Sequence, residues 1–77
     1  MNKSEISVTF ADLSDQAENH NKRIRNRRFF PMQSYRSNRL HEFGMYDSQR
    51  KKYVLGEIGS REAPELLKEI KQMISDA

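Results

Sequence analysis

The chain has 77 residues, a net charge of +3 and no cysteine. A chain of this length is expected to form one domain, and it buries only about 60% of the surface that its unfolded form exposes, so a homodimer would add stability. Without cysteine, disulfides, thiolate zinc sites and thiol nucleophiles are all excluded.

Hydrophobicity excludes a membrane class as well. No stretch approaches the roughly 20 apolar residues that a membrane-spanning helix needs, and residues 1–10 lack the apolar core of a signal peptide. We therefore expect a soluble, cytoplasmic protein with no membrane partner.

The positive charge is concentrated in one segment. Residues 19–41 contain seven Lys or Arg residues and no acid, whereas the segments 1–18 and 42–77 each carry more acids than bases. Most of these bases are Arg, which binds phosphate or carboxylate through two parallel hydrogen bonds better than Lys does. A polyanion such as nucleic acid, or an acidic patch on another protein, is the expected partner.

The first expected element is a short strand near the N-terminus. Residues 5–10 alternate polar and apolar side chains, with Ile6, Val8 and Phe10 on one face. This is the period of a half-buried strand. We therefore expect a short strand here, or a tail that docks onto the rest of the chain.

A polar helix is expected next, over residues 11–26, with Thr9 or Ser14 as its N-cap. Its acids come early and its bases late, which complements the helix dipole. The apolar stripe is thin and three asparagines weaken the helix. Residues 1–27 are therefore predicted to be a polar, basic N-terminal segment that is partly helical or becomes ordered on binding.

An aromatic strand opens the second part of the chain, residues 28–77. Residues 29–35 have an extended, aromatic character, and Pro31 restricts them to an edge strand or a bulge. Core packing is the expected role of Phe29 or Phe30.

A hairpin follows. Residues 40–46 and 52–58 read as two strands, joined by the polar connector 47–51, which has hairpin length. Both faces of this hairpin carry apolar side chains, so the sequence leaves open which face is buried.

The last element is a C-terminal helix. Pro64 stands in the expected first turn, where proline is favoured. An apolar stripe follows at helical spacing, formed by Leu66, Leu67, Ile70, Met73 and Ile74. The predicted fold is therefore α+β, with a small three-stranded antiparallel sheet packed against a C-terminal helix.

The run from Tyr46 to Ala63 resembles the second hairpin and helix start of AP2-type and tyrosine-recombinase arm-type DNA-binding domains. The features that carry the resemblance are an acidic turn residue at Asp47, a Leu-Gly pair ending at Gly56, and a Ser60 followed by Glu-Ala. The resemblance implies a three-stranded sheet that lies in the major groove, backed by a C-terminal helix. Two prolines and the absence of a small Ala face on the helix depart from the family pattern.

The candidate nucleic-acid-binding residues come from the basic segment and the hairpin. Basic residues near the end of the first helix would lie along phosphates or enter the minor groove. Basic residues on the strands and turns would contact phosphates or the edges of nucleobases in the major groove. Aromatic side chains interleaved with Arg, among them Tyr35, would instead stack unpaired bases of single strands or RNA. The full set is Lys22, Arg23, Arg25, Arg27, Arg28, Tyr35, Arg36, Arg39, Arg50, Lys51 and Lys52.

The sequence thus predicts a non-catalytic nucleic-acid-binding protein, with DNA favoured over RNA and double-stranded DNA favoured most. The alternative is a small inhibitor or adaptor, of the kind that phages and mobile elements encode, whose arginines bind an acidic surface of a larger protein. The positions of the acidic residues distinguish the two predicted functions. A DNA-binding protein should keep Glu42, Asp47 and Glu57 away from its basic face, whereas a protein-binding surface can mix both signs.

Catalysis, a metal and a cofactor are not expected. His20 and His41 stand far apart without companions at ligand spacing. The chain contains no Gly-rich phosphate loop and no nucleophile elbow. We therefore predict that the protein is not an enzyme.

Overall fold

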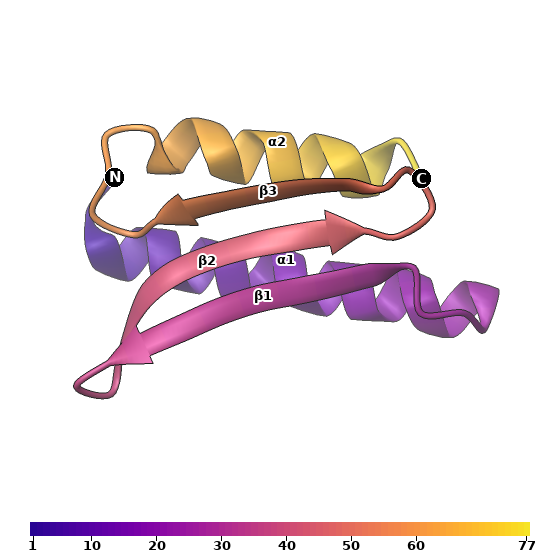
Figure 1. The fold of residues 1–77 in the computed structure, drawn as a ribbon, viewed down its shortest axis with the longest axis horizontal. Helices are drawn as coiled ribbons and strands as arrows, with labels where there is room; N and C mark the ends of the chain where they lie inside the picture. Colours follow the sequence, from indigo (N-terminus) through magenta and orange to yellow (C-terminus); the bar gives the residue numbers. More distant parts are fainter.

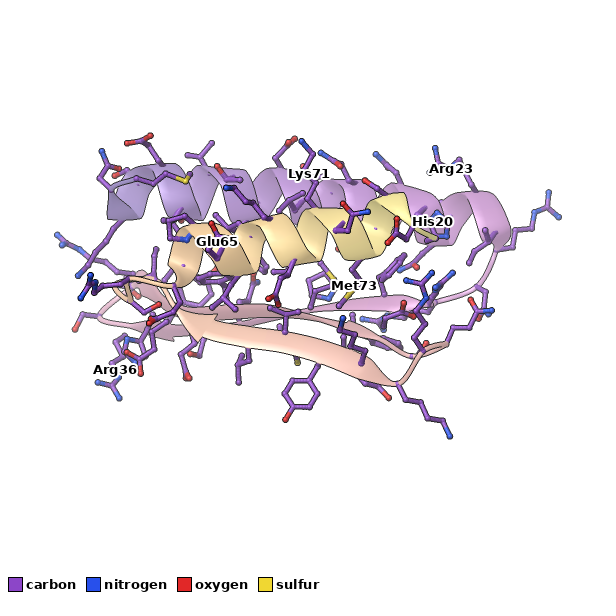
Figure 2. The ribbon with its side chains drawn as sticks, turned by 90° about the horizontal axis from the view of Figure 1, so that it is seen from above. His20, Arg23, Arg36, Glu65, Lys71 and Met73 are labelled. Carbon is purple, nitrogen blue, oxygen red and sulfur yellow. The ribbon has the colours of Figure 1, made fainter.

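The computed structural model describes all 77 residues, in the order helix, three strands, helix. The elements are α1 (Lys3–Ile24), β1 (Phe29–Arg36), β2 (Arg39–Asp47), β3 (Lys52–Glu57) and α2 (Ala63–Ser75). The strands form one antiparallel sheet in the order β1-β2-β3 (Figure 1), and both helices lie on the same side of it (Figure 2). The predicted α+β fold, a three-stranded antiparallel sheet packed against a C-terminal helix, is confirmed.

The N-terminal segment differs from the prediction. The strand expected over residues 5–10 is wrong, because these residues belong to α1. The helix is capped by Asn2, whose side-chain oxygen accepts a hydrogen bond from the Glu5 amide at 2.9 Å, while the Glu5 carboxylate accepts one from the Asn2 amide at 3.3 Å. This capping box satisfies two amides that a helix start leaves free. The predicted caps, Thr9 and Ser14, lie inside the helix.

The apolar residues of α1 form one helical stripe. The buried members, spaced four, three and four residues apart, are Ile6, Phe10, Leu13 and Ala17. Val8, which alternation placed on the same face as Phe10, is 71% exposed because a helix turns it away. The Phe10 ring packs against Phe43 of β2, with the ring centroids 5.5 Å apart. Helix α1 therefore belongs to the same core as the sheet.

Strand pairing agrees with the predicted hairpin. Strands β2 and β3 pair in antiparallel register, with Met45 opposite Val54. Strand β1 lies at an edge of the sheet, as Pro31 required, and its pairing with β2 is irregular between Ser34 and Tyr35.

The face of the sheet that the sequence left undecided is now assigned. The side chains buried between the sheet and the helices include Phe29, Phe43, Met45 and Val54 from the strands and Leu67, Ile70 and Met73 from α2. At Gly56 of β3, an added Cβ would meet Cδ1 of Leu66, so glycine allows α2 to approach β3 closely.

The opposite face of the sheet carries no helix (Figure 2), and we call it the open face. Its residues form three cross-strand rows, which are Phe30-Tyr46-Tyr53, Met32-Gly44-Leu55 and Ser34-Glu42-Glu57. We call the first of these rows the aromatic row. The open face is thus aromatic at one end, apolar in the middle and acidic at the other end.

Candidate functional site

A buried ion pair lies where β1 begins and β2 ends. The Nε and Nη2 atoms of Arg28 donate hydrogen bonds to the two carboxylate oxygens of Asp47, each at 3.0 Å. Both residues are buried. The backbone amides of Gln49 and Arg50 also donate to Asp47 Oδ1, at 3.0 and 3.3 Å. Asp47 therefore holds both the start of β1 and the β2–β3 turn.

The ion pair keeps both of its groups charged. The hydrogen bond to Asp47 raises the pKa of Arg28, although burial opposes this effect. Burial alone would raise the pKa of Asp47, but the hydrogen bonds from Arg28 and from the backbone amides bring it below its ordinary value. The predicted role of Arg28 in ligand binding is therefore corrected, because its guanidinium is buried and its charge is neutralised by Asp47.

Asn21 joins the end of α1 to the start of β1. Its side-chain oxygen accepts hydrogen bonds from the amides of Arg28 and Phe29, both at 3.0 Å, and its side-chain amide donates to the Phe29 carbonyl at 2.9 Å. Ser48, in the β2–β3 turn, donates through its amide and its hydroxyl to the Arg28 carbonyl, at 2.9 and 2.8 Å. The end of α1 and the β2–β3 turn are thus fixed side by side.

The two segments that this junction joins carry six exposed basic residues. They are Lys22, Arg23, Arg25, Arg27, Arg50 and Lys51, and we call them the basic end. The guanidinium of Arg27 lies over the ring of Phe30, with its central carbon 4.7 Å from the ring centroid. Arg50 donates a hydrogen bond to the Asp76 carbonyl at 3.0 Å. Bases that are distant in the sequence, from α1 and from the β2–β3 turn, are therefore brought together.

Three of the other predicted residues lie at the far end of the sheet, and the fourth, Lys52, lies on its helix side. Tyr35, Arg36 and Arg39 flank the β1–β2 turn at the opposite end of the sheet, and Figure 2 shows Arg36 and Arg23 at opposite ends of the molecule. At 3.3 Å per residue, the length of β1 separates the two ends by about 23 Å. Lys52 lies on the helix side of the sheet, in a depression that it shares with Arg50 of the basic end and with the acids Glu69 and Asp76. The predicted residue set is therefore not one site.

The three acids that distinguish the two predicted functions are separated from the basic end or neutralised. Asp47 is neutralised by its ion pair. Glu42 and Glu57 are paired across β2 and β3 on the open face, and Glu42 accepts a hydrogen bond from the Ser34 hydroxyl at 3.1 Å. Glu42 stands four residues before Tyr46 along β2, which corresponds to about 13 Å from the aromatic row. The open face itself carries no Lys or Arg.

The sequence indicated Phe29, Phe30 and Tyr35 for base stacking and did not reveal the alignment of Phe30 with Tyr46 and Tyr53, which forms the aromatic row. Phe30 pairs with Tyr46, and Tyr46 pairs with Tyr53, so the three side chains form a line across the sheet. The rings of Phe30 and Tyr46 are 6.2 Å apart, and Tyr53 is 66% exposed. The alternation of the hairpin placed Tyr46 and Tyr53 on the same face, but only the strand register aligns them with Phe30.

Neither a metal centre nor a similar protein indicates a function for this surface. The chain holds no group of three or more residues arranged to bind a metal ion. His20 is half-buried against the edge of the Phe29 ring, with the ring centroids 5.3 Å apart. Neither helix has the length and apolar composition of a membrane span. No protein-family model, curated protein or solved structure matches the chain.

Proposed function

We propose that the protein binds nucleic acid without catalysis, and that its basic end contacts the phosphate backbone. The observation that carries this proposal is that two separate segments, which together carry six exposed Lys and Arg residues, are held side by side at one end of the molecule. Such a group of cations binds the phosphates of nucleic acid through contacts that do not depend on the nucleotide sequence.

The junction beneath the basic end supports this function. Asn21 and Ser48 hold the end of α1 against the β2–β3 turn through five hydrogen bonds that involve Arg28 and Phe29. The backbones that carry the bases are therefore positioned before a ligand arrives, so less ordering is needed on binding. Lys51 and Arg25 stand at left-handed backbone positions, with φ of 54° at each.

Double-stranded DNA remains the ligand that the sequence resemblance implies. In the AP2-type arrangement a sheet face lies in the major groove, but here the open face carries no Lys or Arg, and two acids occupy one end of it. We therefore propose that the basic end, and not the sheet, contacts the phosphates. The alternative adaptor function would use the same arginines against an acidic protein surface.

The test is fluorescence anisotropy with labelled duplex DNA, single-stranded DNA and RNA, repeated from low to physiological salt. Six phosphate contacts would give a log-log salt slope of about −5 on duplex DNA or about −4 on a single strand. A basic-end variant, Lys22→Gln with Arg23→Gln and Lys51→Asn, should weaken binding and reduce the slope by about half. Asparagine is used at Lys51 because it tolerates the left-handed backbone there.

A matched control removes the same number of charges at the opposite end of the molecule. The control variant combines Arg36→Gln, Arg39→Gln and Arg61→Gln, and it should retain the affinity and salt slope of the unaltered chain. Equal losses in the two variants would show that only net charge matters and would overturn the proposal. Absence of binding to all three nucleic acids at low salt would also overturn it and would favour an acidic protein partner.

A further inference from the structure

We infer that the nucleic acid is single-stranded and that the aromatic row stacks its unpaired bases. This inference rests on the proposed nucleic-acid binding and names the class of ligand for the same site. It is carried by three observations, which are the alignment of the three rings, their position beside the basic end, and the charge distribution of the open face.

The dimensions of the aromatic row suit a short single strand. Neighbouring strands lie about 4.8 Å apart, so the rings of Phe30, Tyr46 and Tyr53 extend over about 10 Å. This length accommodates two or three unpaired bases. Every nucleobase has a flat face that stacks on an aromatic ring, so such a surface tolerates many sequences. Tyr53 is the most exposed of the three residues and offers the most accessible ring.

The row adjoins the part of the basic end that Arg27 and Lys51 form, whereas Arg23 extends from the side of α1 that faces away from the sheet (Figure 2). The guanidinium of Arg27 lies on the Phe30 ring, 4.7 Å from its centroid, and Lys51 stands two residues before Tyr53. The guanidinium therefore occupies one face of Phe30 and marks the boundary between the phosphate contacts and a stacking surface formed chiefly by Tyr46 and Tyr53. A strand that runs across β1, β2 and β3 along the row can place its bases on the rings and its phosphates toward the basic end.

The far end of the open face limits where the strand can lie. Glu42 and Glu57 form a row with Ser34 that lies about 13 Å from the aromatic row. Their negative charges would repel phosphates from that end of the open face. Between the two rows, Met32 and Leu55 form an apolar row without charge. The open face therefore changes along the strands from aromatic side chains, at the end of the sheet that carries the basic end, to acidic ones, and this favours a ligand that runs across the strands at the aromatic end.

A duplex fits this face less well. Its bases are paired and stacked on one another, so their flat faces are not accessible to the aromatic row. Reading base edges in the major groove relies chiefly on Arg, Lys, Asn and Gln, and the open face has none of these. A second copy of the chain is the competing occupant of the open face, since the apolar and aromatic side chains would be buried in a dimer.

The experiment compares a labelled dT octamer with a duplex of the same length. Tyr53→Leu removes an aromatic ring but keeps an apolar side chain, and it should weaken octamer binding about ten-fold, within the range of one base stack, without changing the salt slope. Tyr53→Trp should restore the affinity. Tyr35→Leu is the matched control at the opposite end and should have no effect. The unaltered chain should prefer the octamer to the duplex.

The outcomes separate this inference from the proposal beneath it. If Tyr53→Leu leaves octamer binding unchanged while the basic-end variant still weakens it, stacking is refuted and the proposed function survives. If the basic-end variant also leaves it unchanged, the proposed function fails. Sedimentation equilibrium supplies the remaining outcome, because a dimer that Tyr53→Leu dissociates would assign the open face to a second copy and overturn the inference.

Discussion

Removal of the Asp47 carboxylate should be among the most damaging single changes to the fold. Asp47→Ala leaves the buried Arg28 guanidinium without its bidentate partner and removes the acceptor of two backbone amides. Breaking one side of a buried ion pair costs about 3 to 5 kcal/mol, because the remaining charge stays desolvated. A domain of this size has about 4 to 12 kcal/mol of stability in total. Urea unfolding followed by circular dichroism should therefore show at least about a quarter of the stability lost, and nearly all of it if the total is near the lower figure.

A double variant separates the cost of an unpaired charge from the value of the pair itself. Replacing both partners, Arg28→Met with Asp47→Leu, removes both charges and should recover a large part of the loss. The lost amide contacts at the β2–β3 turn should keep the recovery incomplete. A loss below about 1 kcal/mol for Asp47→Ala would refute the reasoning, because that value is typical of a solvent-exposed pair.

Three further changes test other parts of the fold, each by the same urea titration. Asn21→Ala leaves the amides of Arg28 and Phe29 without an acceptor and should cost about 2 to 3 kcal/mol, whereas a loss under 0.5 kcal/mol would contradict its joining role. Gly56→Ala makes Leu66 Cδ1 move, and because this atom is the end of a flexible, half-buried side chain the cost should stay below about 1 kcal/mol, whereas a larger loss would show that Leu66 cannot turn aside. The pKa of Asp47 is lower in the folded chain than its ordinary value of 3.8. The stability that the ionised carboxylate contributes is therefore complete above about pH 3.8 and is lost as the pH falls through the lower folded-state pKa. Asp47→Asn should flatten this acid dependence, and an equally steep curve would assign it to other carboxylates.

Local patterns predicted the sheet and α2 because each signal is contained in a short window. Pro31 at an edge strand, the polar connector after β2 and the apolar stripe of α2 all agree with the structure. The prediction for the start of α1 was wrong for the same reason. Ile6, Val8 and Phe10 alternate within six residues like a strand, and only the continuation through Leu13 to Ala17 reveals a helical stripe.

The candidate site was predictable as a set of charges but not as an arrangement. The sequence indicated which segment is basic, yet Arg28 is spatially paired with a residue 19 positions away and becomes part of the core. The aromatic row depends on the alignment of β1 with the hairpin, and a shift of one residue would move Phe30 to the other face. Such long-range pairing leaves no signal in a single sequence.

The most direct test of the binding surface is an NMR titration of the ¹⁵N-labelled chain with unlabelled dT octamer. We predict that amide shift changes concentrate at residues 22–30 and 46–54, which carry the basic end and the aromatic row. The region around the β1–β2 turn, residues 35–40, should remain unchanged and serves as an internal control. Changes centred on that turn, or none at saturating octamer, would contradict a single-strand binding surface formed by the basic end and the open face.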